Sequence, residues 1–356
     1  MLASQRSYRI FCYVLCLSCL YILYRNSQLN PLNRRISKSA DQLIKELLNF
    51  HYFNMTLKNF HLRYSMTAPK VKSCYNTTLF VAIMSTGDYL AHAQRAAMRE
   101  TYLAKAPQLN INYKFFIGYR NDSRIDLVTR EMEKYGDIVI IDAFDSYANN
   151  SIKWNAMYQY HQSFCSQSLF FMKIDDDVVV EFDRLFQWLA LDFGGIITGL
   201  TDWLVCQRIQ GVKPYRDKGN KWYVSEAEYP YHWYPVYCNG YTVIMPSQTV
   251  TKVHAEAKRH NFLRIDDVFF TGVTTEAIQV PIVDFQGVLH DFPLAQCLQN
   301  IPLPIVAATG HQLNQVYGQF FKLQLCDDLS EEYRKTPEAN QTVIPPHVEE
   351  DTETSS

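Results

Sequence analysis

The sequence lacks an excess of either charge. Thirty-four Lys and Arg stand against 36 Asp and Glu in 356 residues, which gives a formal net charge of −2. A protein that grips nucleic-acid phosphates needs a basic field, so this balance disfavours a nucleic-acid partner. Charged residues make up only 20% of the chain, whereas 47% are hydrophobic and 14% aromatic. This composition excludes disorder as the dominant state.

Two sequence patterns are also missing. Outside residues 10–24 the chain contains no C-x-x-C, which argues against a zinc ribbon or a thioredoxin-type site. Residues 74–326 contain no internal repeat and no low-complexity segment. Repeat architectures are therefore not expected.

Residues 10–24 form an uncharged apolar run between Arg9 and Arg25. The run is shorter than the roughly 20 residues of an average spanning helix, but flanking arginines snorkel and early secretory membranes are thin. A cleaved signal peptide is the alternative. Because no A-x-A-like small-residue site follows, we favour a retained transmembrane signal-anchor at 10–24 behind a cytosolic tail at 1–9. Basic residues on both sides leave the orientation open.

Glycosylation sequons indicate the orientation. The N-x-S/T triplets all lie C-terminal to the anchor and begin at Asn54, Asn76, Asn121, Asn149 and Asn340. Together they suit a lumenal body. Of nine cysteines, three lie in the anchor, and the even number beyond it is compatible with disulfides in an oxidising compartment. These are Cys74, Cys165, Cys206, Cys238, Cys297 and Cys326.

Composition divides the rest of the chain. Residues 25–73 are polar and basic with one weakly amphipathic stretch, and we expect them to form a stem; a folded subdomain is the alternative. Residues 327–356 are acidic and contain prolines, with no aromatic beyond Tyr333, so they predict a disordered tail. Residues 74–326 remain as a single folded domain.

Within that domain, short runs rich in β-branched and aromatic residues alternate with segments of helical period. Strands are expected at 79–84, 113–117, 138–141 and 169–174, and helices at 88–104, 125–135 and 152–164. This alternation predicts an α/β fold with a mostly parallel central sheet flanked by helices. Ligands of such sheets bind beyond the carboxyl ends of the strands.

Three adjacent carboxylates, Asp175, Asp176 and Asp177, follow the last of these strands directly. In an extended backbone Asp175 and Asp177 point to one side and Asp176 to the other. That pair could share one hard cation, and oxygen ligands favour Mg²⁺ or Mn²⁺ over zinc. A solvated acidic turn is the alternative, but the apolar flanks on both sides favour a metal site.

Four motifs carry a family resemblance. They read RAAMRETY at 95–102, KIDDD at 173–177, KWYVSEAEYPYHWYPVYCNGY at 221–241 and IDDVFFTG at 265–272. In this order, along residues 79–326, they resemble the β-1,3-galactosyltransferase family, which also includes β-1,3-N-acetylglucosaminyl- and N-acetylgalactosaminyltransferases. The resemblance implies a type II Golgi enzyme with a GT-A nucleotide-sugar-binding fold, a Mn²⁺-bound UDP-sugar and inversion at the anomeric carbon.

The resemblance also implies roles at the metal and the nucleotide. Asp175, Asp176 and Asp177 take the DxD function, with Asp177 as the first metal ligand beside Asp175. The late histidine of the family matches His311, and His290 is the fallback. Lys173, at the start of KIDDD, is placed with the cofactor-binding residues.

Other residues are candidates for the donor and acceptor. Arg95 and Arg99, four residues apart on one helical face, could reach a diphosphate, or could pair with carboxylates instead. Trp222 and Tyr237 could stack on sugar rings, although most aromatics of their segment are expected in the core. Gly240 would allow close backbone approach near the donor, or serve a simple turn.

Asp267 is the candidate general base, because inversion in one displacement requires a carboxylate that takes the acceptor's hydroxyl proton. Asp266 replaces the glutamate usual in the family and would orient a neighbouring donor. The alternative is that both residues cap the following helix. The resemblance further implies disulfides Cys165–Cys238 and Cys297–Cys326, which leaves Cys74 and Cys206 as a remaining pair.

The resulting hypothesis is an inverting Golgi glycosyltransferase. It would transfer galactose or an N-acetylhexosamine from a UDP-sugar in β-1,3 linkage to an acceptor sugar on a glycolipid or glycoprotein. A β-1,3-N-acetylglucosaminyltransferase is the alternative within this class. A catalytically silent lumenal sugar-binding protein and a metal-dependent phosphohydrolase are alternatives from other classes; the intact carboxylates argue against the silent protein.

Overall fold

The computed structural model describes residues 48–69, 74–119, 124–284, 288–289 and 306–308. Apart from residues 48 and 49, these belong to one compact unit, residues 50–356. Several predictions lie outside the described residues: the tail at 1–9, the anchor at 10–24, the tail at 327–356, His290, His311, Asn121, Asn340 and the Cys297–Cys326 pair. No helix in the described part has the length and hydrophobicity needed to cross a membrane.

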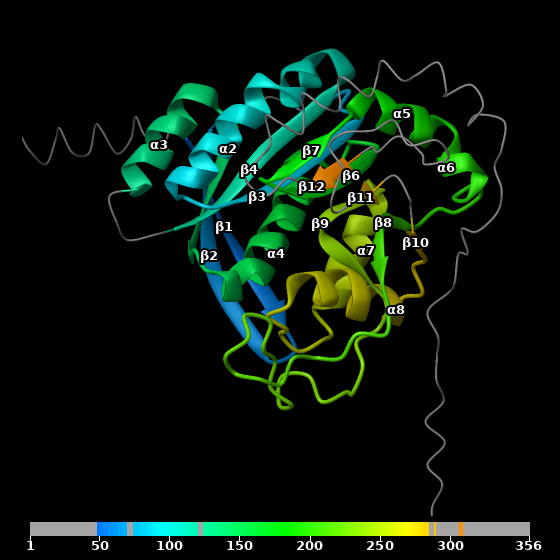
Figure 1. The fold of residues 1–356 in the computed structure, drawn as a ribbon. Helices are drawn as coiled ribbons and strands as arrows, with labels where there is room; N and C mark the ends of the chain where they lie inside the picture. Colours follow the sequence, from blue (N-terminus) through cyan, green and yellow to red (C-terminus); the bar gives the residue numbers. More distant parts are fainter. Residues whose placement is uncertain (1–47, 70–73, 120–123, 285–287, 290–305, 309–356) are drawn as a thin grey trace, which may run out of the picture. The chain divides into compact units, whose positions relative to one another are not determined.

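A nine-stranded sheet organises the described unit, in the order β1-β2-β5-β4-β3-β6-β9-β8-β10 (Figure 1). Its centre is parallel. These strands are β3 (Leu79–Ser85), β4 (Ile111–Tyr119), β5 (Ile138–Phe144) and β6 (Phe170–Asp175). All seven residues of β3 are buried, as expected for a strand covered on both faces. The four predicted strands are therefore confirmed.

Helices cover the two faces of this sheet, with α2 and α3 on one side and α4 on the other (Figure 1). Their bounds are Tyr89–Glu100 for α2, Arg124–Tyr135 for α3 and Asn150–Tyr160 for α4. Because successive strand side chains alternate between faces, Phe80, Ala82 and Met84 join the core under α4. The predicted fold class, an α/β domain with a mostly parallel sheet flanked by helices, is confirmed.

Two of the predicted helices change form before their expected ends. The segment predicted as 88–104 leaves the α-helix after Glu100 and continues as the 3₁₀ segment η1 (Tyr102–Leu109), in which Pro107 cannot continue an α-helical hydrogen-bond ladder. After α4 comes a π-helical turn, η3 (His161–Cys165). At the other end of α2, Asp88 caps the helix by accepting a 2.8 Å hydrogen bond from Ala91 N–H.

Antiparallel strands extend the sheet beyond β6. Strand β9 (Tyr237–Pro246) runs antiparallel to β6 and to β8 (Leu204–Ile209), and β10 (Ile282–Asp284) pairs parallel with β8. A small second sheet joins β7 (Val178–Val180), β11 (Val288–Leu289) and β12 (Val306–Ala308). The remaining helical segments are η2 (Tyr147–Asn149), α5 (Phe182–Ala190), α6 (Asp192–Gly195), α7 (Ser247–Ala257), η4 (Val268–Val273) and α8 (Thr274–Ala277).

Residues 48–69 belong to the sheet, so the prediction of a stem over 25–73 is wrong for this part of the chain. Strands β1 (Leu48–Leu57) and β2 (Phe60–Pro69) form a hairpin, and β2 pairs antiparallel with β5. Burial alternates along β1, where Met55 and Leu57 are buried and the residues between and before them are exposed. This period of two is the sequence signal of a half-buried strand.

Both disulfides in the described residues differ from the predicted pairs. Cys74 bonds Cys165, with Cα atoms 5.0 Å apart, and Cys206 bonds Cys238, at 5.6 Å. The predicted Cys165–Cys238 and Cys74–Cys206 pairs are wrong. Cys74 and Cys165 precede β3 and β6, which are neighbours in the sheet, and Cys206 and Cys238 lie on the neighbouring strands β8 and β9. Strand order therefore decides the pairing.

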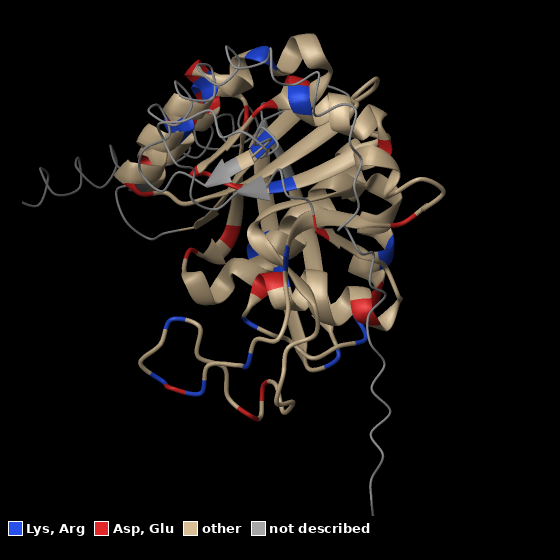
Figure 2. Cartoon of the chain, turned by 45° about the vertical axis from the view of Figure 1, so that its right-hand side comes forward, with Lys and Arg blue, Asp and Glu red and all other residues tan. Residues whose placement is uncertain are grey.

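Charges of both signs are interspersed over the described helices and loops, and no face of one sign is visible in Figure 2. This distribution matches the balanced composition of the chain. In this view the described residues form no extended basic stretch of the kind that binds a polyanion.

Candidate active site

The carboxyl end of β6 meets the start of β9 through Lys173. The Lys173 ammonium donates to Asp175 Oδ1 and to the Gly240 carbonyl, each at 2.5 Å, and lies 4.7 Å from the centre of the Trp154 ring. Only 1% of Lys173 is exposed. Lys173 is therefore a buried cation that joins the predicted acidic motif to the predicted donor-side glycine.

Asp267 lies against the same glycine. A Cβ atom added to Gly240 would lie 3.1 Å from Asp267 Cβ and 3.4 Å from Oδ2, so the absence of a side chain there permits the close approach. The Asp267 carboxylate accepts hydrogen bonds from the Val268 N–H, at 2.7 Å, and from the Gly240 N–H. Asp267 therefore caps the start of η4, as the capping alternative predicted. Its carboxylate also lies against Gly240, on the side of the Lys173 contacts.

Two adjacent carboxyl groups stand in this site, Asp266, which is buried, and Asp267, which is partly exposed. Burial raises the pKa of both, and the charge of Asp266 raises the pKa of Asp267 further. Lys173 opposes the rise in both pKa values, and Lys153 does so for Asp266. A carboxyl group whose pKa is shifted toward neutrality is suited to accept a proton near physiological pH.

The extended backbone assumed for the acidic triplet ends at Asp175, the last residue of β6, and Asp176 and Asp177 form a turn before β7. Asp175 faces Lys173, whereas Asp176 turns to Ser85, whose hydroxyl donates to Oδ2 at 2.6 Å. Burial, with smaller contributions from Asp175 and Asp177, raises the pKa of Asp176 to about 7. The side chain of Asp175 is 36% exposed. All three residues of the triplet are partly exposed.

The donor set fits a divalent cation that takes further oxygens from a diphosphate. In the residues that the structure describes, no group of three or more His, Cys, Asp or Glu side chains could hold a metal ion by itself. Mg²⁺-type sites commonly use one or two carboxylates plus substrate phosphates instead of an all-protein cage. Asp175 and Asp177 match that chemistry.

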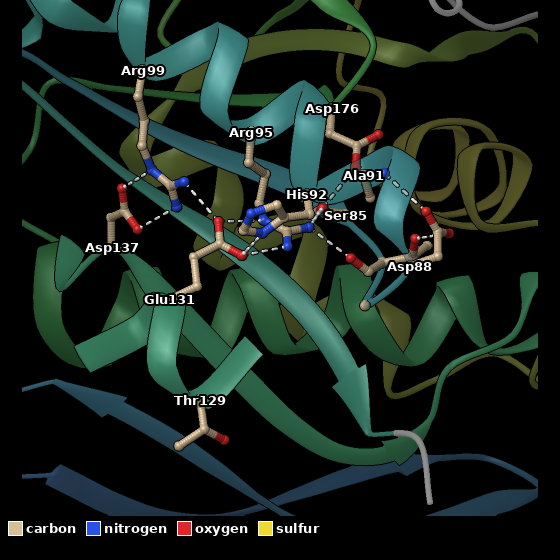
Figure 3. Close-up of polar contacts among 12 residues, drawn as sticks. Ser85, Asp88, Ala91, His92, Arg95, Arg99, Thr129, Glu131, Asp137 and Asp176 are labelled. Atoms are coloured by element: carbon tan, nitrogen blue, oxygen red, sulfur yellow. Dashed lines mark hydrogen bonds and ion pairs between the residues drawn. The ribbon is translucent and has the colours of Figure 1, made fainter. Parts of the chain in front are cut away.

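Arg95 and Arg99 do not face the site as the prediction of diphosphate contact requires (Figure 3). Arg95 is fully buried and donates to both oxygens of Glu131, at 3.0 and 2.6 Å. Arg99 donates to Glu131 at 2.6 Å and to both oxygens of Asp137, at 2.7 and 2.8 Å. This placement supports the carboxylate-pairing alternative, and the prediction of direct nucleotide contact is corrected accordingly.

Arg95 still reaches the acidic triplet indirectly. Its guanidinium donates to Ser85 Oγ at 2.8 Å and to the Thr86 carbonyl at 2.6 Å, and Ser85 in turn donates to Asp176. Figure 3 shows this chain of contacts from Glu131 to Asp176. Arg95 therefore acts on the orientation of the triplet and not on a ligand.

Aromatic side chains line the approach to Asp267. The pKa of Tyr147 lies well above its ordinary value because of burial and the charges of Asp266 and Asp267, and the pKa of Tyr237 is raised by burial and Asp267. Trp222 is 39% exposed, and the ammonium of its neighbour Lys221 lies 5.6 Å from the centre of the Tyr147 ring. Of the two predicted substrate residues, Tyr237 is thus within the field of Asp267, and Trp222 lies on the segment that reaches Tyr147.

The prediction that most aromatics of this segment pack in the core is wrong, because only two of the seven are buried and Trp222, Tyr231 and Trp233 are exposed. Tyr229 and Tyr234 are each 8% exposed and join the main hydrophobic cluster. Their ring centroids lie 5.1 Å apart. Only part of the aromatic segment is therefore available to a sugar.

Sequence reasoning missed Lys153 and Asp145. The Lys153 ammonium donates to Asp145 Oδ1 at 2.9 Å and to the Ser85 carbonyl at 3.2 Å, and both side chains are almost fully buried. A Cβ on Gly118 would lie 2.9 Å from Asp145 Cα, so this glycine is needed for the approach. The available signal was a lysine inside the apolar helix 152–164, where an unpaired ammonium would be costly.

A cavity of 490 Å³ lies elsewhere, between α7, residues 199–202 and residues 278–281. None of the predicted site residues lines it, and the charged groups at its wall already pair, Lys252 with Asp202 and Arg259 with Glu256. The chemistry of the side chains, and not the size of this cavity, therefore locates the candidate site.

Comparison with known proteins identifies the class. Residues 93–286, more than half of the chain, match the galactosyltransferase family, and the protein belongs to this family. Over 226 residues it is 27% identical to human β-1,3-galactosyltransferase 5, covering 62% of this chain and 70% of the relative. Over 176 residues it is 28% identical to human lactosylceramide 1,3-N-acetyl-β-D-glucosaminyltransferase, covering 48% and 46%. The protein is a hexosyltransferase by family.

Among solved structures, the galactosyltransferase LgtC in complex with donor and acceptor sugar analogs aligns with a TM-score of 0.34 and 12% identity. The alignment covers 67% of this chain and 95% of that chain. A likeness of this size carries no argument about function. The fold assignment rests on the sheet described above.

Proposed function

We propose that this protein is an inverting β-1,3-galactosyltransferase that uses UDP-galactose and an acceptor sugar on a glycolipid or glycoprotein. The observation that carries the proposal is the Asp267 carboxylate, which lies against Gly240 and whose charge acts on Tyr147 and Tyr237. Family membership supplies the reaction class, and this geometry supplies a base in reach of an aromatic platform.

In the proposed reaction the acceptor oxygen forms a bond to the anomeric carbon as the bond from that carbon to UDP breaks. The electron pair leaves with UDP, and the acceptor's hydroxyl proton passes to Asp267. The two backbone N–H groups at Asp267 orient its carboxylate, and its raised pKa favours receipt of the proton. Asp266 is buried, and its interaction with Asp267 raises the pKa of the base further.

We further propose that Asp175 and Asp177 hold a Mn²⁺ ion together with the UDP diphosphate, with His311 as a further ligand outside the described residues. Bound there, the ion would offset negative charge on the leaving group. Lys173 supports this arrangement because it fixes Asp175 relative to Gly240 and so to the base.

The deciding experiment supplies purified protein with UDP-galactose, UDP-N-acetylglucosamine or UDP-N-acetylgalactosamine and a panel of acceptor sugars. We expect β-1,3-linked product from UDP-galactose, and a rate lower by about 10²- to 10⁴-fold for Asp267→Asn with UDP affinity retained. Asp142→Asn, at an exposed position on β5, is the matched control and should keep full activity. Near wild-type turnover by Asp267→Asn would show that Asp267 is not the base.

A second function is favoured by one observation, the 28% identity to an N-acetylglucosaminyltransferase. The same screen separates the two, because product formation from UDP-N-acetylglucosamine alone would replace galactose as the donor sugar. A silent sugar-binding protein would consume no UDP-sugar with any acceptor. A phosphohydrolase would release inorganic phosphate without forming a new glycosidic bond.

We also propose a Golgi membrane location with a lumenal catalytic domain. Asn54 and Asn76 support it, because both sequon asparagines are exposed. The Asn149 amide instead donates to the Phe144 carbonyl at 2.8 Å, and the hydroxyl of its sequon partner Ser151 is buried and bonded to another carbonyl. Glycosidase treatment should lower the mass of the secretory-pathway protein, and Asn54→Gln with Asn76→Gln should remove most of that change. An unchanged mass would contradict lumenal exposure.

A further inference from the structure

A long loop carries the exposed part of the aromatic segment. Residues 210–236 connect β8 to β9 without a helix or a strand longer than the single bridge between Tyr215 and Tyr223. Arg216 ties the loop internally, because its guanidinium donates to the carbonyls of Val224 and Tyr229 at 2.8 and 2.7 Å. The loop therefore has its own fixed form, and Val224, Tyr229 and Tyr234 anchor it in the main hydrophobic cluster. The part around Trp222 is exposed, so a polar contact is needed to fix its place against the site.

Arg264 supplies that contact. It lies two residues before Asp266, and its guanidinium Nη2 donates to the Lys221 carbonyl at 3.2 Å. Its backbone N–H donates to Glu228 Oε1 at 2.9 Å. The two hydrogen bonds hold the loop at Lys221, directly before Trp222, and at Glu228, six residues after it. The chain segment that carries the acid pair is thereby fastened to the aromatic loop.

The loop also contacts a second residue near the acid pair. The Lys221 ammonium lies 5.6 Å from the centre of the ring of Tyr147, which begins η2, and the charges of Asp266 and Asp267 act on the Tyr147 hydroxyl. The ring of Tyr215 stands beside Trp222, with centroids 5.5 Å apart. A flat, partly exposed ring near a base is suited to carry the apolar face of a sugar whose hydroxyl points to that base.

We propose that Arg264 is a positioning residue for the acceptor sugar: it holds Lys221 and Trp222 at a fixed distance from Asp267, so that a sugar stacked on Trp222 presents its hydroxyl to the base. The inference rests on the proposed glycosyl transfer. Small misplacements of a reacting group are costly in rate, which is why a rigid connection between platform and base matters. Arg264 touches neither donor nor base in this scheme.

The test separates acceptor binding from donor binding. Arg264→Ala should raise the acceptor KM about tenfold, as expected for loss of one charge-assisted hydrogen bond, while the affinity for UDP stays within about twofold. Arg259→Ala is the matched control, because the Arg259 side chain is 79% exposed and lies away from the site. An unchanged acceptor KM in Arg264→Ala, or a parallel loss of UDP affinity, overturns the inference.

The hydrogen bond from the Arg264 N–H to Glu228 gives an independent test if Arg264→Ala does not fold. Glu228→Gln keeps an oxygen that can accept from the Arg264 N–H and should preserve the acceptor KM, whereas Glu228→Ala should raise it with UDP affinity intact. Equal behaviour of the two Glu228 variants overturns the inference. Absence of transfer by the wild type would overturn the proposed function itself, whereas transfer with unaltered acceptor KM in the variants rejects only the role of Arg264.

Discussion

Two charged clusters meet at Ser85, which is hydrogen-bonded to Arg95 of the first and to Asp176 of the second, and their carboxyl groups behave in opposite ways. The second cluster also contains Asp175, Asp266 and Asp267. In the first cluster, Arg95 and Arg99 hold Glu131, and these contacts lower the pKa of Glu131 to about 2 despite its burial. In the second cluster, burial dominates and the pKa values of Asp266 and Asp267 are raised. In the first cluster each carboxylate is paired with arginine, whereas in the second cluster two carboxyl groups lie next to each other.

The difference teaches which cluster serves the fold and which serves chemistry. Buried charges that are completely paired contribute to the native state, and removal of one partner leaves the others uncompensated. Adjacent carboxyl groups with raised pKa values cost stability at neutral pH, so their presence points to a functional requirement. The first cluster is therefore structural support for the second.

The largest expected effect comes from breaking the paired cluster. Glu131→Ala leaves Arg95 and Arg99 buried without their shared carboxylate and should lower the free energy of unfolding by about 3–5 kcal/mol at pH 7. Because the folded-state pKa of Glu131 lies below its ordinary value, the stability it adds is present above about pH 4.5 and is lost as the pH falls through about 2. Urea unfolding at several pH values measures both.

The control for this prediction is Glu133→Ala, at an exposed position of the same helix, which should change the free energy of unfolding by less than about 0.5 kcal/mol. Equal stability of Glu131→Ala and the wild type at pH 7 would contradict a supporting role for the paired cluster.

The second prediction sharpens the comparison from the other side. Asp267→Asn removes a partly exposed carboxylate whose pKa is raised, and should raise the free energy of unfolding at pH 7 by on the order of 1 kcal/mol, even as activity is lost. A raised folded-state pKa means that wild-type stability falls as the pH rises above about 4, so the gap between variant and wild type should close near pH 4. A variant less stable than the wild type at pH 7 would argue that Asp267 is held for the fold.

The smallest effect is expected where the two clusters meet. Ser85→Ala removes the hydroxyl between Arg95 and Asp176 and should cost about 1 kcal/mol, because one buried donor and acceptor are lost. Loss of the Ser85 donor should raise the pKa of Asp176 further, which carboxyl NMR titration can follow. Ser146→Ala, whose hydroxyl makes no capping bond to η2, is the control. An unaltered Asp176 titration would show that the clusters are independent.

Much of the site was predictable, because its residues sit in short motifs at the ends of strands. Asp175, Asp267 and Gly240 come from three separate motifs, and the structure brings them together around Lys173 as the strand ends imply. Arg95 was misassigned for a physical reason: an arginine on a helix after the first strand suits a phosphate and a carboxylate equally, and Glu131 on a neighbouring helix decides between them. No local pattern pointed to Arg264.

The sequence by itself determined the four parallel strands, the helices between them and the placement of the acidic triplet at a strand end. These features follow from local periodicity, which the chain shows over a few residues at a time. Tertiary structure alone decided that residues 48–69 join the sheet, that Cys74 bonds Cys165, and that Gly240 meets Asp267. Each of these depends on which distant segments become neighbours, and that order is set by packing of the whole sheet.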